Sequence, residues 1–329
     1  MTHEEGHRTI LNSKGIGSVS RPYWDLKTGA AYVNGVRDSE LKNLRDTDFQ
    51  SYIRLHTAGI ESDYMIALRI KTLTVFEQDK RSYLFNDWMI RKFGVIAYCF
   101  SSIFTSLEPA LKEDPNELKR DIVGHDVYSA IRHLHRPEMN FYRYTRYDSL
   151  TTTEKRFVKR VGFRSLLNAF DLLSFGSKPN IQLSNNLKFM FGLGYTMCPF
   201  GDFIDENLWF SYRDKLNMFV YFRQYQNKTY WFPATGISIV DYPIKNRFVS
   251  TFSLHLWEQP EDLNFTTSKG KFGAAGEVLV KYKYFTKDKT NLKAISIDLG
   301  VICKSFGYLP EEIIMNKHFG VRFGTSLYL

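Results

Sequence analysis

The chain has 329 residues, of which 43% are hydrophobic, 16% aromatic and 24% charged. This composition excludes a chain that is disordered throughout, because it can bury enough apolar surface to offset the entropy lost on folding. No stretch reaches the roughly 18 to 20 uninterrupted apolar residues of a membrane-spanning helix, and the best candidate, Phe93 to Phe104, has 12. The net charge of +9 is scattered along the sequence, so we do not expect a nucleic-acid partner.

The beginning of the chain and its cysteines give further expectations about its N-terminus and its thiol chemistry. Residues 1–12 (MTHEEGHRTILN) have no basic start, apolar segment or small-residue cleavage site, so we do not expect them to be a secretory signal. A motif begins at His3, and a helix shorter than about 12 to 15 residues is marginal by itself, so we expect the natural chain to have a further segment before Met1.

Cys99, Cys198 and Cys303 form no CxxC pair, and we expect them to be packing residues.

Residues 38–176 carry mostly helical patterns. Apolar residues recur every three or four positions from Asp48 to Phe76 and from Asp121 to Leu134, which predicts a helix over each segment. Asp114, Pro115 and Asn116 are typical of a helix start ahead of the second segment. A third helix is expected from Thr153 to Leu173, after an irregular connection.

The period changes to two after residue 180, which predicts strands. Eight segments of 9 to 15 residues can be drawn, at about 186–197, 205–213, 215–226, 229–241, 246–258, 272–286, 291–304 and 317–329. Strands of soluble sheets are mostly about 5 or 6 residues long, whereas transmembrane strands need about 9 to 11. The pattern therefore predicts an α+β protein with a helical domain over residues 1–180 and an antiparallel β-barrel over residues 181–329.

Alternation within these segments favours a barrel of the outer-membrane type. In the last segment, Phe319, Val321 and Phe323 share one face, while Gly320 and Arg322 share the other. An apolar outer face and a polar inner face are typical of a barrel in lipid. Aromatic residues near segment ends and a final amphipathic strand support the same location. The alternative is a soluble antiparallel barrel, whose apolar face points inward.

The motif at the start of the chain is His3-Glu4-Glu5-Gly6-His7, which satisfies H-E-x-x-H. On a helix, residues four apart share a face, so His3 and His7 can direct two imidazoles at one ion, with Glu4 beside it. Zinc in hydrolytic sites usually takes three protein ligands and keeps one position for water. The candidate third ligand is Glu61, which lies within the first predicted helix.

This arrangement resembles the gluzincin metallopeptidases, in which a Glu on a second helix completes the zinc site. The resemblance implies that His3, His7 and Glu61 are metal ligands and that Glu4 is the general base. Gluzincins commonly place a supporting Asp four residues after the ligand Glu, but that position is Met65 here.

This departure leaves His56 and Asp63 as alternative third ligands. The helical region also resembles uncharacterised outer-membrane proteins of the Bacteroidota, which join such an HEEGHR segment to a C-terminal barrel. That resemblance brings no established activity with it.

Further histidines lie in the second predicted helix. His125, Asp126, His133 and His135 are close in sequence, but no carboxylate or cysteine spacing completes a second metal set. We therefore interpret them as capping, salt-pairing or core residues.

Together these patterns predict an outer-membrane zinc metallohydrolase acting on a peptide or another amide. The main alternative is a non-enzymatic outer-membrane barrel for transport, anchoring or structural support. A third alternative is a soluble α+β protein with an internal ligand cavity.

Overall fold

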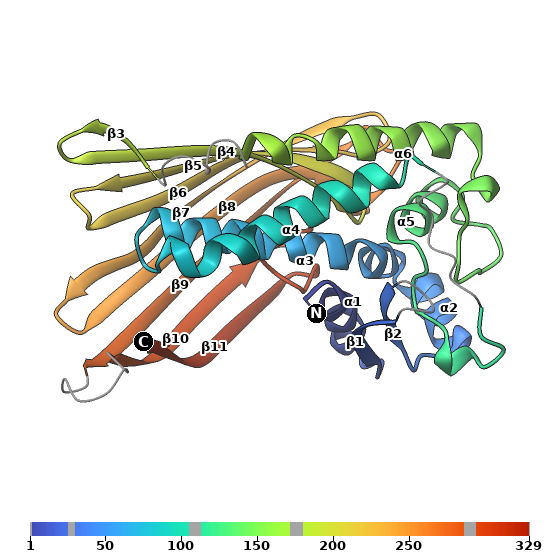
Figure 1. Ribbon diagram of the computed structural model, residues 1–329, viewed down its shortest axis with the longest axis horizontal. Helices are drawn as coiled ribbons and strands as arrows, with labels where there is room; N and C mark the ends of the chain where they lie inside the picture. Colours follow the sequence, from blue (N-terminus) through green and yellow to red (C-terminus); the bar gives the residue numbers. More distant parts are fainter. Residues whose placement is uncertain (1, 26–29, 105–112, 172–179, 286–293, 329) are drawn as a thin grey trace.

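The computed structural model describes residues 2–25, 30–104, 113–171, 180–285 and 294–328, and helices fill its first half (Figure 1). The α-helices are α1 (Thr2–Ser13), α2 (Asp38–Thr47), α3 (Phe49–Val75), α4 (Arg81–Ser101), α5 (Asp126–His135) and α6 (Thr152–Ser165). A hairpin of β1 (Val19–Asp25) and β2 (Ala30–Asn34) follows α1. Three short 3-10 turns cover Glu117–Lys119, Tyr147–Ser149 and Glu261–Leu263.

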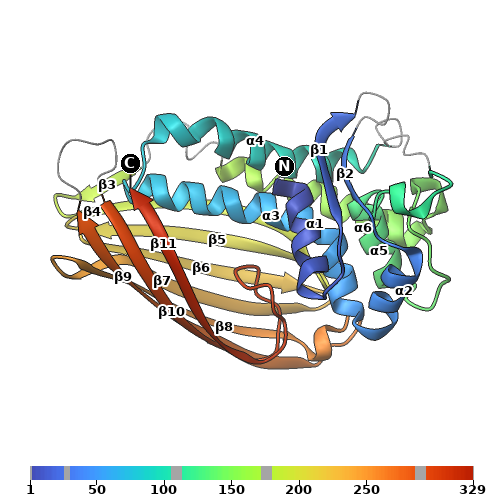
Figure 2. The same cartoon turned by 90° about the horizontal axis from the view of Figure 1, so that it is seen from below.

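The longest helix, α3, confirms the prediction for its segment almost to the residue. The Asp48 carboxylate accepts a hydrogen bond from the backbone N–H of Ser51, which satisfies one of the unpaired donors of the first turn. The helix is buried on most of its surface. It lies between the large sheet and α4 (Figure 2).

Two other helix predictions need correction. The predicted helix from Asp121 begins only at Asp126, because Gly124 has a φ of +74° that interrupts helical geometry. The start signal at Asn116 caps a 3-10 turn. The third predicted helix, Thr153 to Leu173, is interrupted: α6 ends at Ser165, a turn covers residues 166–167, and residues 168–171 are helical again, while the predicted end at Leu173 lies outside the described residues.

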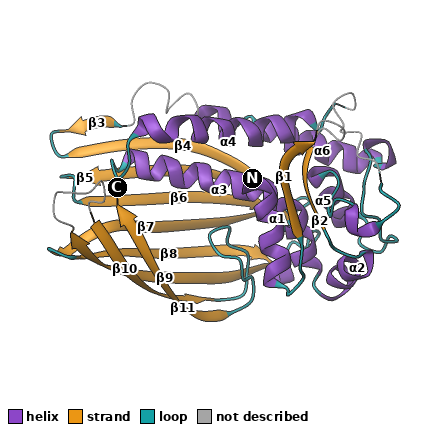
Figure 3. Cartoon of the chain, turned by 60° about the horizontal axis from the view of Figure 1, so that its bottom comes forward, coloured by secondary structure: helices purple, strands orange, loops and turns teal. Residues whose placement is uncertain are grey.

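The second half forms a single antiparallel sheet. Its strands are β3 (Ile181–Ser184), β4 (Leu187–Cys198), β5 (Gly201–Tyr212), β6 (Leu216–Gln226), β7 (Trp231–Lys245), β8 (Phe248–Pro260), β9 (Gly270–Phe285), β10 (Ala294–Lys304) and β11 (His318–Tyr328). Each strand pairs with its neighbours in chain order, from β3 at one edge to β11 at the other. Within the described residues the two edge strands do not pair, so the expected barrel is present only as an open sheet (Figure 3).

The two faces of the sheet differ in polarity. On β10, Ile297, Leu299 and Val301 are exposed, with Leu299 at 53%, whereas Ser296 is 1% exposed. The exposed apolar residues of the other long strands include Phe191, Phe222, Phe252, Leu254, Leu256, Val278, Phe319, Val321, Phe323 and Leu327. The face turned away from the helices is therefore largely apolar. Separately, none of the described helices is both long and apolar enough to cross a membrane.

The three cysteines differ in burial according to the part of the fold in which they lie. Cys99 and Cys198 are buried, as expected of packing residues, whereas Cys303 on β10 is exposed. The prediction is thus wrong for Cys303, because its position in the strand alternation places it on the outward face.

Polar contacts join α3 to the inner face of the sheet. The Tyr64 hydroxyl donates to the Asp205 carboxylate at 2.7 Å, and the same carboxylate accepts two hydrogen bonds from Arg223 at 2.6 and 2.9 Å. Gly194 on β4 makes room for this contact, because a Cβ there would collide with the Tyr64 ring. The inner face of β4 to β6 is thus filled by the helix.

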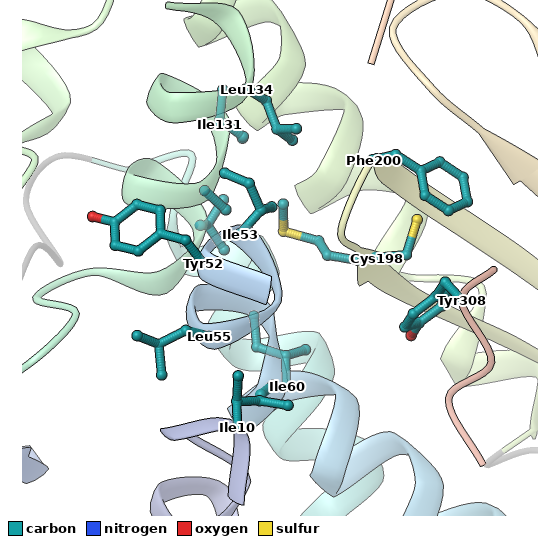
Figure 4. Packing of buried hydrophobic residues seen from close by; sticks show 14 of the residues in the cluster. Ile10, Tyr52, Ile53, Leu55, Ile60, Ile131, Leu134, Cys198, Phe200 and Tyr308 are labelled. Atoms are coloured by element: carbon teal, nitrogen blue, oxygen red, sulfur yellow. The ribbon is translucent and has the colours of Figure 1, made fainter. Parts of the chain in front are cut away.

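The helical part and the sheet also share one hydrophobic core. Buried side chains of α1, α3 and α5 meet those of the turn between β4 and β5, as Ile10, Ile60, Leu134 and Phe200 illustrate (Figure 4). The strands of the large sheet begin at Ile181, where the sequence pattern changes, but the core extends across that boundary.

The buried Arg223–Asp205 pair gives a test of how the sheet is held to α3. Both side chains are 0% exposed, so Arg223→Leu leaves a buried carboxylate without its counter-charge. We expect the free energy of unfolding to fall by about 3–5 kcal/mol, measured by urea unfolding followed by tryptophan fluorescence. The control is Lys42→Leu, which breaks the exposed pair of Lys42 with Asp46, whose side chains are 57% and 41% exposed, and should cost less than about 1 kcal/mol. Equal losses in the two variants would contradict this account.

Candidate metal centre

Helix α1 places the two motif histidines side by side. His3 and His7 lie one turn apart on α1, with ring centroids separated by 5.1 Å. The helix lies across α3, and Gly6 allows close contact because a Cβ there would collide with the carbonyl group of Ala58. The imidazoles are thereby directed into the space between α1, α3 and α5.

The third donor in this space is Asp126, the first residue of α5. Its Oδ2 atom lies 3.0 Å from His3 Nε2 and 3.5 Å from His7 Nε2. The three donor atoms all lie within 4.8 Å of one another, and this is the one group of three such residues found among the described part of the chain. His7 and Asp126 are buried, whereas the His3 side chain is 22% exposed.

The other ring nitrogen of each histidine is held by an acceptor. His7 Nδ1 lies 2.6 Å from the carbonyl oxygen of Leu55, and His3 Nδ1 lies 3.1 Å from Asp63 Oδ2. A carbonyl oxygen only accepts, so Nδ1 of His7 carries the proton and its Nε2 is the atom available to a cation. Metal-binding histidines in proteins are oriented by such partners. Arg91 in turn donates to Asp63 at 3.0 Å.

Two of the three distances between donor atoms are compatible with a tetrahedral zinc ion. Zinc–nitrogen and zinc–oxygen distances near 2.0–2.1 Å imply ligand atoms about 3.3 Å apart, and the two contacts of Asp126 measure 3.0 and 3.5 Å. Gly59 of α3 keeps the space between them open. A Cβ at Gly59 would lie 2.6 Å from His7 Nε2 and closer still to His3 Nε2, so any larger residue would fill the position of an ion.

His3, His7 and Asp126 stabilise one another's charged forms. Burial opposes protonation of both imidazoles, yet hydrogen bonds to Asp126 and Asp63 raise the pKa of His3 well above 6.5. The charge of Asp126 likewise raises the pKa of His7 against the effect of burial. Burial also opposes ionisation of Asp126, but the two histidines hold its pKa far below its ordinary value. A divalent cation would find an ionised carboxylate and would displace protons on binding.

Two further carboxyl groups lie near the histidines. Glu4 follows His3 on α1 and is buried, and its negative charge acts on His7. Asp121 accepts hydrogen bonds from the backbone N–H groups of Val33 and Gly124. Burial, and then the charge of Glu4, raise the pKa of Asp121 to about 7. Asp121 can therefore exchange a proton near neutral pH.

Glu61, the predicted third ligand, lies in a different environment. Its carboxylate forms a buried ion pair with Arg54, with a closest distance of 2.6 Å. It also lines a cavity of about 300 Å³ between α1, α3 and the loop near Pro310. The group that gathers around His3 and His7 thus contains Asp126, and Glu61 is not a member of it.

Asp63 and His56, the alternative third ligands, also lie outside the group formed by His3, His7 and Asp126. Asp63 supports His3 from behind, so its part is to orient a ligand. The His56 ring stacks on His133 at 5.6 Å, and burial lowers the pKa of His56 to about 3. His56 therefore stays neutral inside the helical core.

The interpretation as core residues holds for His133 and His135 of α5 and for His125, which immediately precedes the helix. His125 stacks on Tyr128 at 3.7 Å, His133 lies 3.2 Å from the Tyr52 hydroxyl, and His135 bonds to the carbonyl of Ile131. Asp126 is salt-paired, as that interpretation also allows, and its partners are the motif histidines His3 and His7. No spacing in the sequence signals this role, since Asp126 lies 119 residues beyond His7 and only the fold brings the two together.

Comparisons of the chain with protein-family models, with curated proteins and with solved structures gave no match. The geometry of the site is therefore the basis for assigning a role.

Metal binding gives a direct test of which residue completes the site. We expect the purified protein to bind one zinc ion, and His7→Ala and Asp126→Ala to lose it, because each removes a donor atom. Asp63→Asn should weaken binding about 10- to 100-fold, as loss of an orienting partner does.

Elemental analysis and competition with a chelating dye measure these effects. Glu61→Gln is the matched control and should keep full zinc content. Loss of zinc in Glu61→Gln together with retention in Asp126→Ala would restore Glu61 as the third ligand.

Proposed function

We propose that this protein is an outer-membrane zinc metallohydrolase whose metal is held by His3, His7 and Asp126. The observation that carries the proposal is the convergence of two Nε2 atoms on one carboxylate oxygen, with each Nδ1 atom held by an acceptor. Histidine and carboxylate ligands of this kind are typical of catalytic zinc sites.

The chemistry proposed for the site divides between the metal and Glu4. When bound, zinc supplies a Lewis acid that polarises a carbonyl group and lowers the pKa of water to about 7. Glu4 would take the proton from the attacking water and pass it to the leaving amine. Its position next to His3 on the same helix, with its charge acting on His7, supports this role. The substrate class is a peptide or another amide.

Exposure indicates the side from which a substrate would approach. His7 and Asp126 are buried, whereas His3, Asp63 and Arg91 are each partly exposed. Access to the metal would therefore be from the His3 side. Arg91 bridges Asp63 and Asp87 there, so its charge is already paired and it serves to hold Asp63 behind His3.

The outer-membrane location rests on the polarity of the sheet. Its long strands expose apolar residues on the face away from the helices and turn Asp205, Arg223 and Ser296 inward. This is the arrangement expected of strands that face lipid. A soluble barrel would have the opposite polarity, which disfavours the soluble alternative.

Of the non-enzymatic roles, transport has the least support. The inner side of β4 to β6 is occupied by α3, through Tyr64 against Asp205 and the Trp209 indole bonded to Thr72. A helix in this place obstructs a water-filled path. Anchoring or structural support remains the alternative function, because the apolar face serves it equally well.

Substitution of the proposed base tests the enzymatic half of this proposal. Glu4→Gln removes the proton acceptor but leaves all three metal ligands, so amide hydrolysis should fall at least about 100-fold while zinc content stays unchanged. Quenched fluorescent peptide libraries, with mass spectrometry of the products, measure the activity. Glu5→Gln is the matched control, because Glu5 is the exposed neighbour, and it should retain activity. Equal activity in Glu4→Gln and wild type would exclude Glu4 as the base.

Insertion into lipid vesicles tests the proposed outer-membrane location. The double substitution Ile297→Lys and Leu299→Lys places two charges on the apolar face. Each charge near the middle of a bilayer costs about 2–4 kcal/mol of insertion free energy. We expect the variant to lose stable insertion into phosphatidylcholine vesicles, assayed by flotation and protease protection. Lysines at Glu206 and Gln224, which are exposed polar positions, form the control. Full solubility of the wild-type protein without detergent would contradict a lipid-facing sheet.

A further inference from the structure

The two ends of the large sheet differ in charge. The hairpin turns that join β5 to β6 and β7 to β8 point away from α1, α2 and α5, whereas the other end of the sheet lies next to these helices (Figure 1). Residues 184–187, 212–216, 241–248 and 281–285 at the first end contain six lysines or arginines and two aspartates. Residues 198–201, 226–231, 258–271 and 304–318 at the other end contain five basic and five acidic residues. Positive charge is therefore concentrated at the hairpin end.

Four basic side chains at the hairpin end form a surface that we call the basic rim. They are Arg213 and Lys215 in the β5–β6 turn and Lys245 and Arg247 in the β7–β8 turn. All four are exposed, and the described residues form no salt bridge with any of them. The two hairpins are neighbours in the sheet, and strands lie about 4.8 Å apart. The four charges are therefore presented side by side.

The acidic residues at this end do not neutralise the basic rim. Lys188 pairs with Glu77 and Asp214 at 2.8 and 2.9 Å, and Lys281 pairs with Asp241 at 2.8 Å. The turn between α3 and α4, residues 77–81, lies beside them and has two acidic and two basic residues. These three carboxylates thus have basic partners outside the rim, and the rim keeps its positive charge.

Aromatic side chains lie between the basic rim and the apolar part of the outer face. Along β8, the exposed residues Leu254 and Phe252 are followed by Phe248 and then by Arg247 at the turn. The Phe248 ring lies 5.1 Å from that of Tyr282 on β9, and the Tyr282 hydroxyl accepts a hydrogen bond from Arg247 at 3.1 Å. The order from the middle of the sheet towards the turns is aliphatic, aromatic and basic. Other exposed aromatic residues at this end are Tyr212, Tyr242 and Tyr284.

We propose that the basic rim binds the phosphate-bearing, anionic headgroups of a membrane, in the leaflet farther from the metal centre. This inference rests on the lipid-facing sheet of the proposed function and adds the class of lipid and the direction of insertion. Aromatic girdles of membrane barrels lie at the interfaces with water, so basic residues just beyond them lie at the depth of the headgroups.

The chemistry of the rim suits this partner. Lysine and arginine near a membrane surface attract anionic lipids, and arginine donates paired hydrogen bonds to phosphate oxygens. A soluble anionic partner would need no aromatic side chains between the rim and an apolar face. The opposite end of the sheet has balanced charges, so it offers no comparable attraction.

Flotation of the full chain with vesicles of two compositions tests the basic rim. The rim variant carries Arg213→Gln, Lys215→Gln, Lys245→Gln and Arg247→Gln. One basic residue near an anionic surface strengthens association about five-fold. We therefore expect the wild type to bind at least about ten-fold more strongly to vesicles with about one fifth phosphatidylglycerol than to pure phosphatidylcholine. The rim variant should lose most of this gain, and salt of about 0.5 M should abolish it in the wild type.

The matched control removes four exposed charges from the other end of the sheet. It carries Lys228→Gln, Lys269→Gln, Lys271→Gln and Lys317→Gln, so its net charge equals that of the rim variant. We expect it to keep the preference for phosphatidylglycerol, because these positions lie far from the proposed headgroup contact.

A second measurement leaves the rim charges in place and does not depend on folding of the rim variant. The background is Cys303→Ser, since the other two cysteines are buried. Asn246→Cys carries a fluorescent label at the β7–β8 turn, and Thr229→Cys carries the same label at the opposite end. In mixed vesicles, spin-labelled phosphatidylglycerol should quench the label at position 246 about twice as strongly as spin-labelled phosphatidylcholine. The label at position 229 should be quenched equally by both.

The outcomes separate this inference from the membrane location. Insertion into pure phosphatidylcholine without a preference for phosphatidylglycerol would overturn the assignment of the basic rim and leave the lipid-facing sheet intact. An equal loss in the two charge variants, or equal quenching by the two lipids at position 246, would overturn it in the same way. Failure to insert into vesicles of either composition would overturn the location itself, and the headgroup contact with it.

Discussion

The candidate site depends on the close crossing of α1 over α3. Two glycines allow it: Gly6 lies against the carbonyl of Ala58, and Gly59 leaves the space into which both imidazoles point. Any side chain at either position would hold the helices apart. At this short separation, His7 reaches the carbonyl of Leu55 and His3 reaches Asp63. The H-E-x-x-H motif of α1 forms a site because no side chain at Gly6 or Gly59 separates α1 from α3. The two histidines can therefore reach groups of α3 directly.

Helix α3 also joins the site to the sheet. Consecutive residues of this helix reach different partners: Asp63 supports His3, and Tyr64 donates to Asp205 on β5. Gly194 accommodates Tyr64 on the sheet side as Gly59 accommodates the histidines on the other. A shift of α3 in the sheet would therefore move the orienting carboxylate of the metal centre. If the sheet lies in a bilayer, as we propose, the site is held at a fixed place relative to the membrane.

Local patterns in the sequence predict much of the fold. The three- to four-residue period identifies α3, and Asp48 marks its start, because capping and periodicity act over a few residues. The two-residue alternation identifies the long strands and assigns inward and outward positions, as Leu299 and Ser296 show. Whether the sheet closes is not a local property. It depends on what covers each edge, and Asn168 and Lys71, which cover β4, lie in helices far away in the sequence.

The site was predictable only in part for the same reason. His3, Glu4 and His7 are found from their spacing, because one helical turn brings them together. Asp126 is contributed by another helix, and a sequence pattern cannot choose it from 35 acidic residues. Glu61 is eligible by residue type, but its carboxylate pairs with Arg54, which lies about two turns earlier on α3.

We propose that His3, His7 and Asp126 together hold a catalytic zinc ion. X-ray absorption spectroscopy at the zinc edge of the zinc-loaded protein tests this arrangement most directly. We predict a first shell of nitrogen and oxygen donors with the multiple-scattering signature of two imidazoles, losing one imidazole in His7→Ala and staying unchanged in Glu61→Gln. A shell without imidazole scattering, or one identical in wild type and His7→Ala, would contradict the account.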